Sequence, residues 1–126
     1  MKVLVVDDSL VVRTIIQKTI ESMGHTAVHA SNGQEALDVL AQQASDIALV
    51  LLDWNMPYMD GHETINNIKR NNAYDHLCII MISTESEDDK VGQALAAGAN
   101  GYLTKPFSQG ELASKIESTL AEFKSK

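Results

Sequence analysis

The chain has 126 residues, of which 44% are hydrophobic and 21% charged, a composition typical of one folded domain rather than of a disordered segment. Its formal net charge is −7 and its ten Lys and Arg residues are scattered, which argues against direct binding to nucleic acid. No apolar run is long enough for a signal peptide or a membrane span, and the single Cys78 has no partner for an internal disulfide. We therefore expect a cytoplasmic protein with no membrane role.

Short β-branched runs alternate with longer stretches of helical periodicity along the chain. In order, the pattern predicts a strand and then a helix five times over: 3–6 and 10–23, 26–29 and 33–42, 47–52 and 62–71, 79–82 and 88–97, 102–104 and 110–123. The runs 3–6 and 47–52 are apolar at every position, which indicates strands covered on both faces, as in a parallel sheet between helices. We therefore predict one doubly wound α/β domain over residues 1–126.

Local signals at the predicted helix ends support these five units. Three polar side chains stand three residues before an acid, the spacing of a helix N-terminal cap: Asn32 with Glu35, Ser86 with Asp89, and Ser108 with Glu111. Gly24 and Gly98 are expected to end two of the helices, because glycine adopts the left-handed conformation that follows a helix at little cost.

Polar and charged residues follow four of the five predicted strands. They are Asp7 and Asp8 after the first, Asp53 after the third, Ser83 and Thr84 after the fourth, and Lys105 after the fifth. The carboxyl ends of parallel strands meet at one edge of an open α/β sheet, where ligands bind. These residues are therefore predicted to form one site.

Simple addition of charge suggests what this site binds. Asp7, Asp8 and Asp53 contribute −3, whereas one Mg²⁺ and Lys105 contribute +3, and carboxylate oxygens suit a hard cation. We interpret Asp53 as a nucleophile that takes up a phosphoryl group as an acyl phosphate. Mg²⁺, Lys105 and the hydroxyl of Ser83 are then expected to stabilise the three equatorial phosphoryl oxygens.

Several motifs resemble those of one known family. Leu4-Val5-Val6-Asp7-Asp8-Ser9, Asp53-Trp54-Asn55-Met56-Pro57 with Asp60-Gly61, Ser83, and Lys105-Pro106-Phe107 are similar to the motifs of response-regulator receiver domains. The resemblance covers essentially the whole chain and is closest to the small stand-alone regulators of the CheY type, which carry no output domain. It implies a five-stranded parallel sheet in the order 2-1-3-4-5.

The resemblance also implies a role for each site residue. Asp8, Asp53 and the backbone carbonyl of Asn55 would bind Mg²⁺ directly, and Asp7 would bind it through water. A sensor histidine kinase would phosphorylate Asp53, and Lys105 and Ser83 would hold the phosphoryl group. The Lys105–Pro106 peptide bond is expected to be cis.

Signal output is a further implication of the resemblance. Ser83 would move toward the phosphoryl group and Tyr102 would turn inward, which would change the face formed by the helices 88–97 and 110–123 and the strand between them. A protein partner would read that face, and we expect a role in chemotaxis or motility with a flagellar motor switch as the partner. The alternative is a phosphorelay shuttle that passes the phosphoryl group to another histidine protein. The chain itself is expected to be a monomer.

Three residues are expected to modulate this chemistry. Thr84 is larger than the residue that many family members carry there, so it is expected to narrow access to Asp53. Asn55 and Glu85 flank the expected path of the attacking water, and we predict a short-lived phosphorylated state. We also expect Trp54 to be partly exposed beside the site.

Three other functions fit parts of the pattern. An aspartate-nucleophile phosphohydrolase would also use Mg²⁺, although Asn55 occupies the position at which its general acid is expected. A flavin or nucleotide module would need a glycine-rich loop after the first strand, where the acids stand instead. An unphosphorylated interaction domain would keep the fold without the chemistry.

Overall fold

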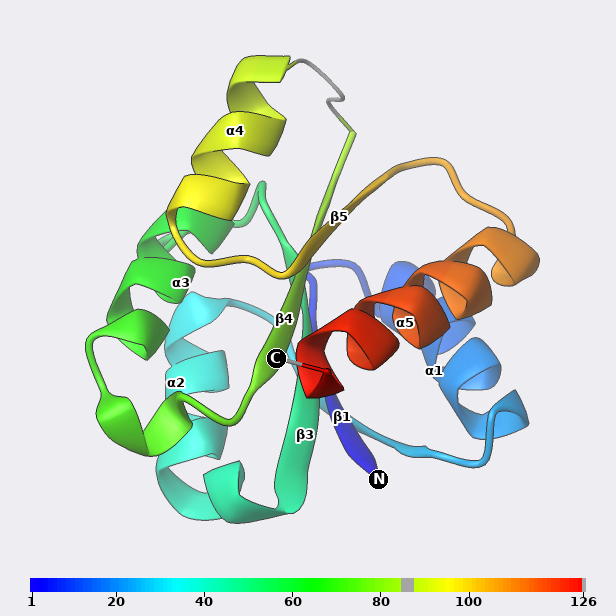
Figure 1. The fold of residues 1–126 in the computed structure, drawn as a ribbon, viewed down its shortest axis with the longest axis horizontal. Helices are drawn as coiled ribbons and strands as arrows, with labels where there is room; N and C mark the ends of the chain where they lie inside the picture. Colours follow the sequence, from blue (N-terminus) through cyan, green and yellow to red (C-terminus); the bar gives the residue numbers. More distant parts are fainter. Residues whose placement is uncertain (85–87, 126) are drawn as a thin grey trace.

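A computed structural model describes residues 1–84 and 88–125, without the side chains of residues 88–90. Its centre is a five-stranded parallel sheet in the order β2-β1-β3-β4-β5 (Figure 1). The strands are β1 (Lys2–Val6), β2 (Thr26–Ala30), β3 (Ile47–Asp53), β4 (Cys78–Ser83) and β5 (Gly101–Thr104). The expected fold and strand order are thus confirmed.

Five α-helices connect and follow the strands. They are α1 (Leu10–Ser22), α2 (Gly33–Gln43), α3 (Gly61–Lys69), α4 (Asp88–Ala96) and α5 (Gln109–Lys124), with short 3-10 turns at Ala44–Asp46 and Asn72–Tyr74. Within the described residues, no helix is both long enough and apolar enough to span a membrane.

Helix ends follow the expected capping chemistry. The Asn32 side chain accepts a hydrogen bond from the backbone N–H of Glu35 at 2.8 Å, and Ser108 and Glu111 form a reciprocal capping box at the start of α5. Gly24 and Gly98 have positive φ angles of 85° and 111° just past α1 and α4. The predicted cap at Ser86 lies outside the described residues.

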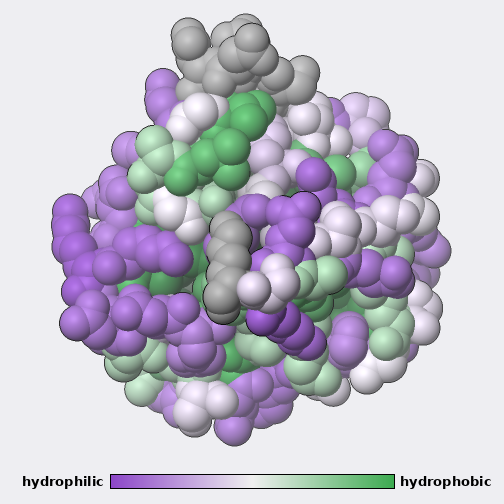
Figure 2. All heavy atoms as spheres, viewed as in Figure 1, coloured by the Kyte–Doolittle hydropathy of each residue, from purple (hydrophilic) through white to green (hydrophobic). Residues whose placement is uncertain are grey.

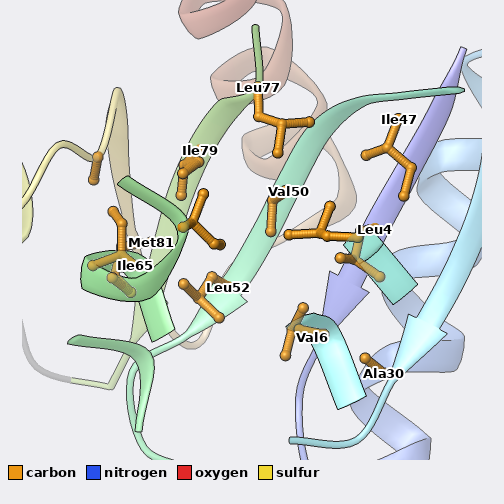
Figure 3. Close-up of a cluster of buried hydrophobic side chains, with 14 of the residues drawn as sticks. Leu4, Val6, Ala30, Ile47, Val50, Leu52, Ile65, Leu77, Ile79 and Met81 are labelled. Atoms are coloured by element: carbon orange, nitrogen blue, oxygen red, sulfur yellow. The ribbon is translucent and has the colours of Figure 1, made fainter. Parts of the chain in front are cut away.

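Helices cover both faces of the sheet, α2, α3 and α4 on one and α1 and α5 on the other (Figure 1). Alternate strand residues divide between two buried clusters, because successive side chains of a strand point to opposite faces. Leu4 and Val6 belong to the cluster under α2, α3 and α4 (Figure 3), and Val3 and Val5 to the cluster under α1 and α5. The continuous apolar runs in the sequence follow from this double burial.

Most predicted boundaries differ from the observed ones by a single residue. The most useful difference is at β3, which continues through Asp53, because the backbone of Asp53 still pairs with Ile82 of β4. The carboxylate therefore stands on the last residue of a central strand, where the pairing with β4 still holds the backbone in place. A rigid strand end positions a side chain more accurately than a loop would.

Candidate phosphoryl-accepting site

Three carboxylates meet at the carboxyl edge of the sheet. Asp7 and Asp8 follow β1, Asp53 ends β3, and one oxygen from each lies within 4.8 Å of the others. Asp7 and Asp53 are buried, with 2% and 4% of their surface exposed, whereas Asp8 is exposed. The convergence predicted from the sequence is therefore present in the structure.

A single lysine bridges two of these acids. The Lys105 Nζ lies 2.9 Å from Asp7 Oδ2 and 3.3 Å from Asp53 Oδ1. Its position depends on β5, because the Lys105 backbone N–H donates to the Ser83 carbonyl at 2.7 Å and so holds the end of β5 against β4. The Lys105–Pro106 peptide bond is cis, as expected.

Burial and charge alter the acidity of the two reactive groups. Burial and the neighbouring Asp7 carboxylate raise the pKa of Asp53 from 3.8 to about 6, and Lys105 offsets only part of that effect. Burial by itself lowers the pKa of Lys105, but the hydrogen bond to Asp7 and the charges of Asp53 and Asp7 together outweigh it and raise that pKa. Lys105 is therefore a cation at neutral pH, and it does not fully neutralise the acids.

Asp7 and Asp8 differ in how their side chains are held. Asp7 Oδ1 accepts from the backbone N–H of Ser9 at 2.9 Å, and Asp7 Oδ2 accepts from Lys105. Within the described residues, the Asp8 carboxylate has no hydrogen bond, and it lies exposed at the rim of the cluster. Asp7 is thus a fixed part of the site, and Asp8 has both oxygens available for a ligand.

The cluster fits a metal ion by its chemistry. Its donors are carboxylate oxygens from three positions close together, the type of ligand set that hard divalent cations prefer. Burial, and after it the charges of Asp7 and Asp8, raise the pKa of Asp53, so a cation beside these groups would stabilise the ionised carboxylate. The residues present therefore fit a bound divalent cation.

Comparison with known proteins identifies the family. A model of the response regulator receiver domain matches residues 3–117. The chain belongs to the receiver domain family. This assignment decides against the phosphohydrolase and the flavin module that the sequence pattern left open.

Receiver domains of chemotaxis proteins are among its relatives. The Campylobacter jejuni "Chemotaxis protein CheY homolog" is 41% identical over 121 residues, which cover 95% of this chain and 92% of that protein. The Helicobacter pylori "Chemotaxis protein CheY1" is 40% identical, with 95% of this chain and 97% of that protein covered. The solved structure of the chemotaxis response regulator CheY4 of Vibrio cholerae superposes with a TM-score of 0.88, at 31% identity, over 94% of this chain and 97% of that one.

The other predicted site residues of this receiver domain belong to β4, β5 and the loops that follow β3 and β4. Ser83 is the last residue of β4, the strand beside the one that carries Asp53, and it is buried. Asn55 and Thr84 are exposed, in the loops that follow β3 and β4. Tyr102 is partly buried in β5 and packs on the core cluster beneath α2, α3 and α4. Glu85 lies outside the described residues, so its predicted effect on the lifetime of the phosphorylated state stays a prediction.

The prediction that Trp54 is partly exposed is wrong. Only 5% of its surface is exposed, and its ring belongs to the core cluster, with the ring of His62 at a centroid distance of 5.5 Å. The backbone explains this burial, because the Trp54 N–H donates to the Ile82 carbonyl at 2.8 Å and continues the pairing of β3 with β4. The chain therefore leaves the sheet after Trp54, and Asn55 is the first exposed residue.

Glycine is required where the loop from β3 returns to α3. The Gly61 N–H donates to the Trp54 carbonyl at 2.8 Å, and a Cβ on Gly61 would come within 2.8 Å of the Trp54 Cα. Backbone atoms cannot move aside as a flexible side chain can. The Asp60-Gly61 pair thus lets α3 begin directly against the strand that carries Asp53, with Asp60 as its N-cap.

Tyr58, at the tip of the same loop, has a strained backbone. Its φ is 69°, the only positive value among the described non-glycine residues, and 95% of its surface is exposed. We expect Tyr58→Gly to raise the free energy of unfolding by about 0.5 to 1 kcal/mol, because the relief of strain exceeds the entropy that glycine adds to the unfolded chain. Urea unfolding measures this change, and Tyr58→Ala, which keeps a Cβ, should give no such gain.

Two residues that hold Asp7 in place were not predicted. Ser9 orients Asp7 through its backbone and caps α1 through its side chain, and a serine immediately before an apolar run was the available signal. Arg13 of α1 donates to the Asp7 carbonyl. No motif in the sequence indicated Arg13, because its partner is a backbone atom that only the packing of α1 on the sheet brings near.

Proposed function

We propose that this receiver domain accepts a phosphoryl group on Asp53 from a sensor histidine kinase, with Mg²⁺ bound, and acts in chemotaxis through a protein partner. The observation that carries the proposal is the placement of one buried carboxylate, Asp53, 3.3 Å from a lysine Nζ and beside two further acids. The same placement argues against an unphosphorylated interaction domain, for which a raised pKa on a buried acid brings no benefit.

The hydrogen bonds of the three acids support different roles for them in binding Mg²⁺. Asp8, Asp53 and the backbone carbonyl of Asn55 would hold Mg²⁺ directly. Asp7 would act through water, since Ser9 and Lys105 already occupy its two oxygens. When bound, the cation supplies positive charge for the oxygens of the incoming phosphoryl group.

The side chains then have separate tasks in the transfer. One oxygen of the ionised Asp53 attacks phosphorus, and the bond between phosphorus and the donor breaks, which leaves an acyl phosphate. Lys105 is already charged and moves only its Nζ, from the carboxylates to a phosphoryl oxygen. Ser83, on the neighbouring strand end, would donate its hydroxyl to another of these oxygens. In this proposal the domain catalyses its own phosphorylation and dephosphorylation.

Output would occur at the face formed by α4, β5 and α5. Tyr102 stands on β5 of this face, Leu95 of α4 is 50% exposed, and a groove of about 630 Å³ between β5 and α5 is lined by residues that include Leu103 and Lys115. The view in Figure 2 is mostly polar, with an apolar patch near its top. A flagellar motor switch is the partner we favour, because the relatives carry chemotaxis names; a phosphorelay shuttle is the alternative.

Intact mass tests the proposal. The protein is incubated with acetyl phosphate, with and without Mg²⁺, and Asp53→Asn serves as the control. We expect one phosphoryl adduct that requires Mg²⁺, maps to the peptide that contains Asp53, and is absent from the variant. An adduct on another residue, or none from either acetyl phosphate or a phosphorylated histidine kinase, would contradict the proposal and favour the interaction domain.

A further inference from the structure

A chain of polar side chains connects α1 and β2 to the acid cluster. Arg13 Nη1 donates to the Asp7 carbonyl, and Arg13 Nε donates to His29 Nδ1 at 3.2 Å. The other ring nitrogen of His29, Nε2, lies 2.8 Å from Gln17 Oε1, one helical turn beyond Arg13 on α1. Arg13, Gln17 and His29 are all partly buried.

The hydrogen bonds fix the protonation of His29. An arginine Nε always donates, so His29 Nδ1 must accept, and the ring proton is then on Nε2, which donates to Gln17. Burial and the charge of Arg13 lower the pKa of His29, in agreement with a neutral ring. The guanidinium of Arg13 is thus hydrogen-bonded to His29 through Nε and to the Asp7 carbonyl through Nη1.

The carbonyl that Arg13 binds belongs to the peptide bond between Asp7 and Asp8. The Asp7 N–H donates to the Ala30 carbonyl at 3.1 Å, the last bond that ties this residue to β2. Beyond that bond, Arg13 holds the Asp7 carbonyl, and with it the plane of the following peptide. That plane sets the direction in which the Asp8 side chain leaves the backbone.

We infer that Arg13, held in place by His29, is a positioning residue for cation binding, because it fixes the Asp7–Asp8 peptide plane and so aims the Asp8 carboxylate at the site. Asp8 needs such help more than Asp7 does, since within the described residues its carboxylate has no hydrogen bond of its own. The inference rests on the proposed function, in which Asp8 is a direct ligand of Mg²⁺.

Charge alone predicts the opposite effect. Arg13 brings a positive charge near the site, so if it acted only through charge, its removal would tighten the binding of a divalent cation. If it acts by position, its removal weakens binding. Arg13→Lys separates the two, because lysine keeps the charge but lacks the planar group that bonds Asp7 and His29 at once.

The test is a titration of the full chain with Mg²⁺ alone, followed by NMR signals of the backbone amides at the strand ends. We expect the dissociation constant to rise about tenfold in Arg13→Gln and Arg13→Lys, the effect typical of residues that orient metal ligands. His29→Leu should shift it in the same direction by less. Thr14→Ala is the matched control, because the Thr14 hydroxyl bonds only within α1, to Leu10.

A second readout separates positioning from general damage to the fold. At saturating Mg²⁺, Arg13→Gln should regain most of the parent rate of phosphorylation by acetyl phosphate, whereas a damaged fold would stay slow at every concentration. Unchanged or tighter Mg²⁺ binding in both Arg13 variants would overturn the inference and leave the proposed function intact. Absence of Mg²⁺ binding by the parent chain would overturn both.

Discussion

Replacing Lys105 by alanine is expected to slow the phosphorylation of Asp53 by acetyl phosphate by about 100- to 1,000-fold at saturating Mg²⁺. The Nζ of Lys105 is the only side-chain cation that the described residues place in contact with Asp53, at 3.3 Å. Its loss removes a charge that would stabilise the phosphoryl oxygens in the transition state. Initial rates of adduct formation, measured by intact mass, give the ratio directly.

Two further variants define what Lys105 contributes. Lys18→Ala removes an exposed lysine of α1 and should leave the rate unchanged. Lys105→Arg keeps the charge but places it on a longer, planar group. We expect this variant to lose part of the phosphorylation rate, because the compact ammonium group of Lys105 contacts both Asp7 and Asp53. A rate for Lys105→Ala within a few-fold of the parent would show that the lysine serves only to pair the acids in the resting state.

In the metal-free protein, Asp53→Asn is expected to raise the free energy of unfolding by about 1 to 3 kcal/mol at about pH 8. The raised pKa of Asp53, about 6 against 3.8, is the net result of burial, Asp7 and Lys105. Between these two values the native state binds a proton that the unfolded chain has lost. The parent therefore loses stability as the pH rises through this window, and the variant does not.

The effect of pH and of Mg²⁺ on the stability gain of Asp53→Asn tests whether the charge of Asp53 causes that gain. At about pH 4 the parent carboxyl is largely protonated in the native state, so parent and variant should differ little. Saturating Mg²⁺ at about pH 8 should reduce the difference, because the cation binds the native parent more tightly than the variant. Urea unfolding in chelator, at both pH values, measures these differences. A gain that is the same at both pH values would show that the charge of Asp53 is not its cause.

Much of this fold can be predicted from the sequence, because double burial leaves a simple pattern. The runs 3–6 and 47–52 are apolar at every position, and the structure divides each between two core clusters. The convergence of Asp7, Asp53 and Lys105 follows from parallel strands alone. The strand order, in contrast, came from the resemblance to receiver domains.

Features that depend on tertiary contacts could not be predicted. Trp54 seemed to start a loop, but a backbone hydrogen bond to β4 keeps it in the core. Arg13 and His29 belong to different elements with no recognisable spacing, and their contact exists only because α1 packs beside β2. The site roles, a single domain without an output domain, and a monomeric state remain predictions.

The salt bridge between Asp7 and Lys105 joins residues 98 positions apart in the chain. A contact between residues so far apart in the chain forms slowly during folding, because β3, β4 and β5 must first pair to bring the two residues together. Until β5 has paired with β4, the acids of β1 and β3 lack their cation. If Asp53 is the phosphoryl acceptor, as proposed, a half-folded chain in which β5 is still unpaired would therefore be phosphorylated far more slowly than the folded domain.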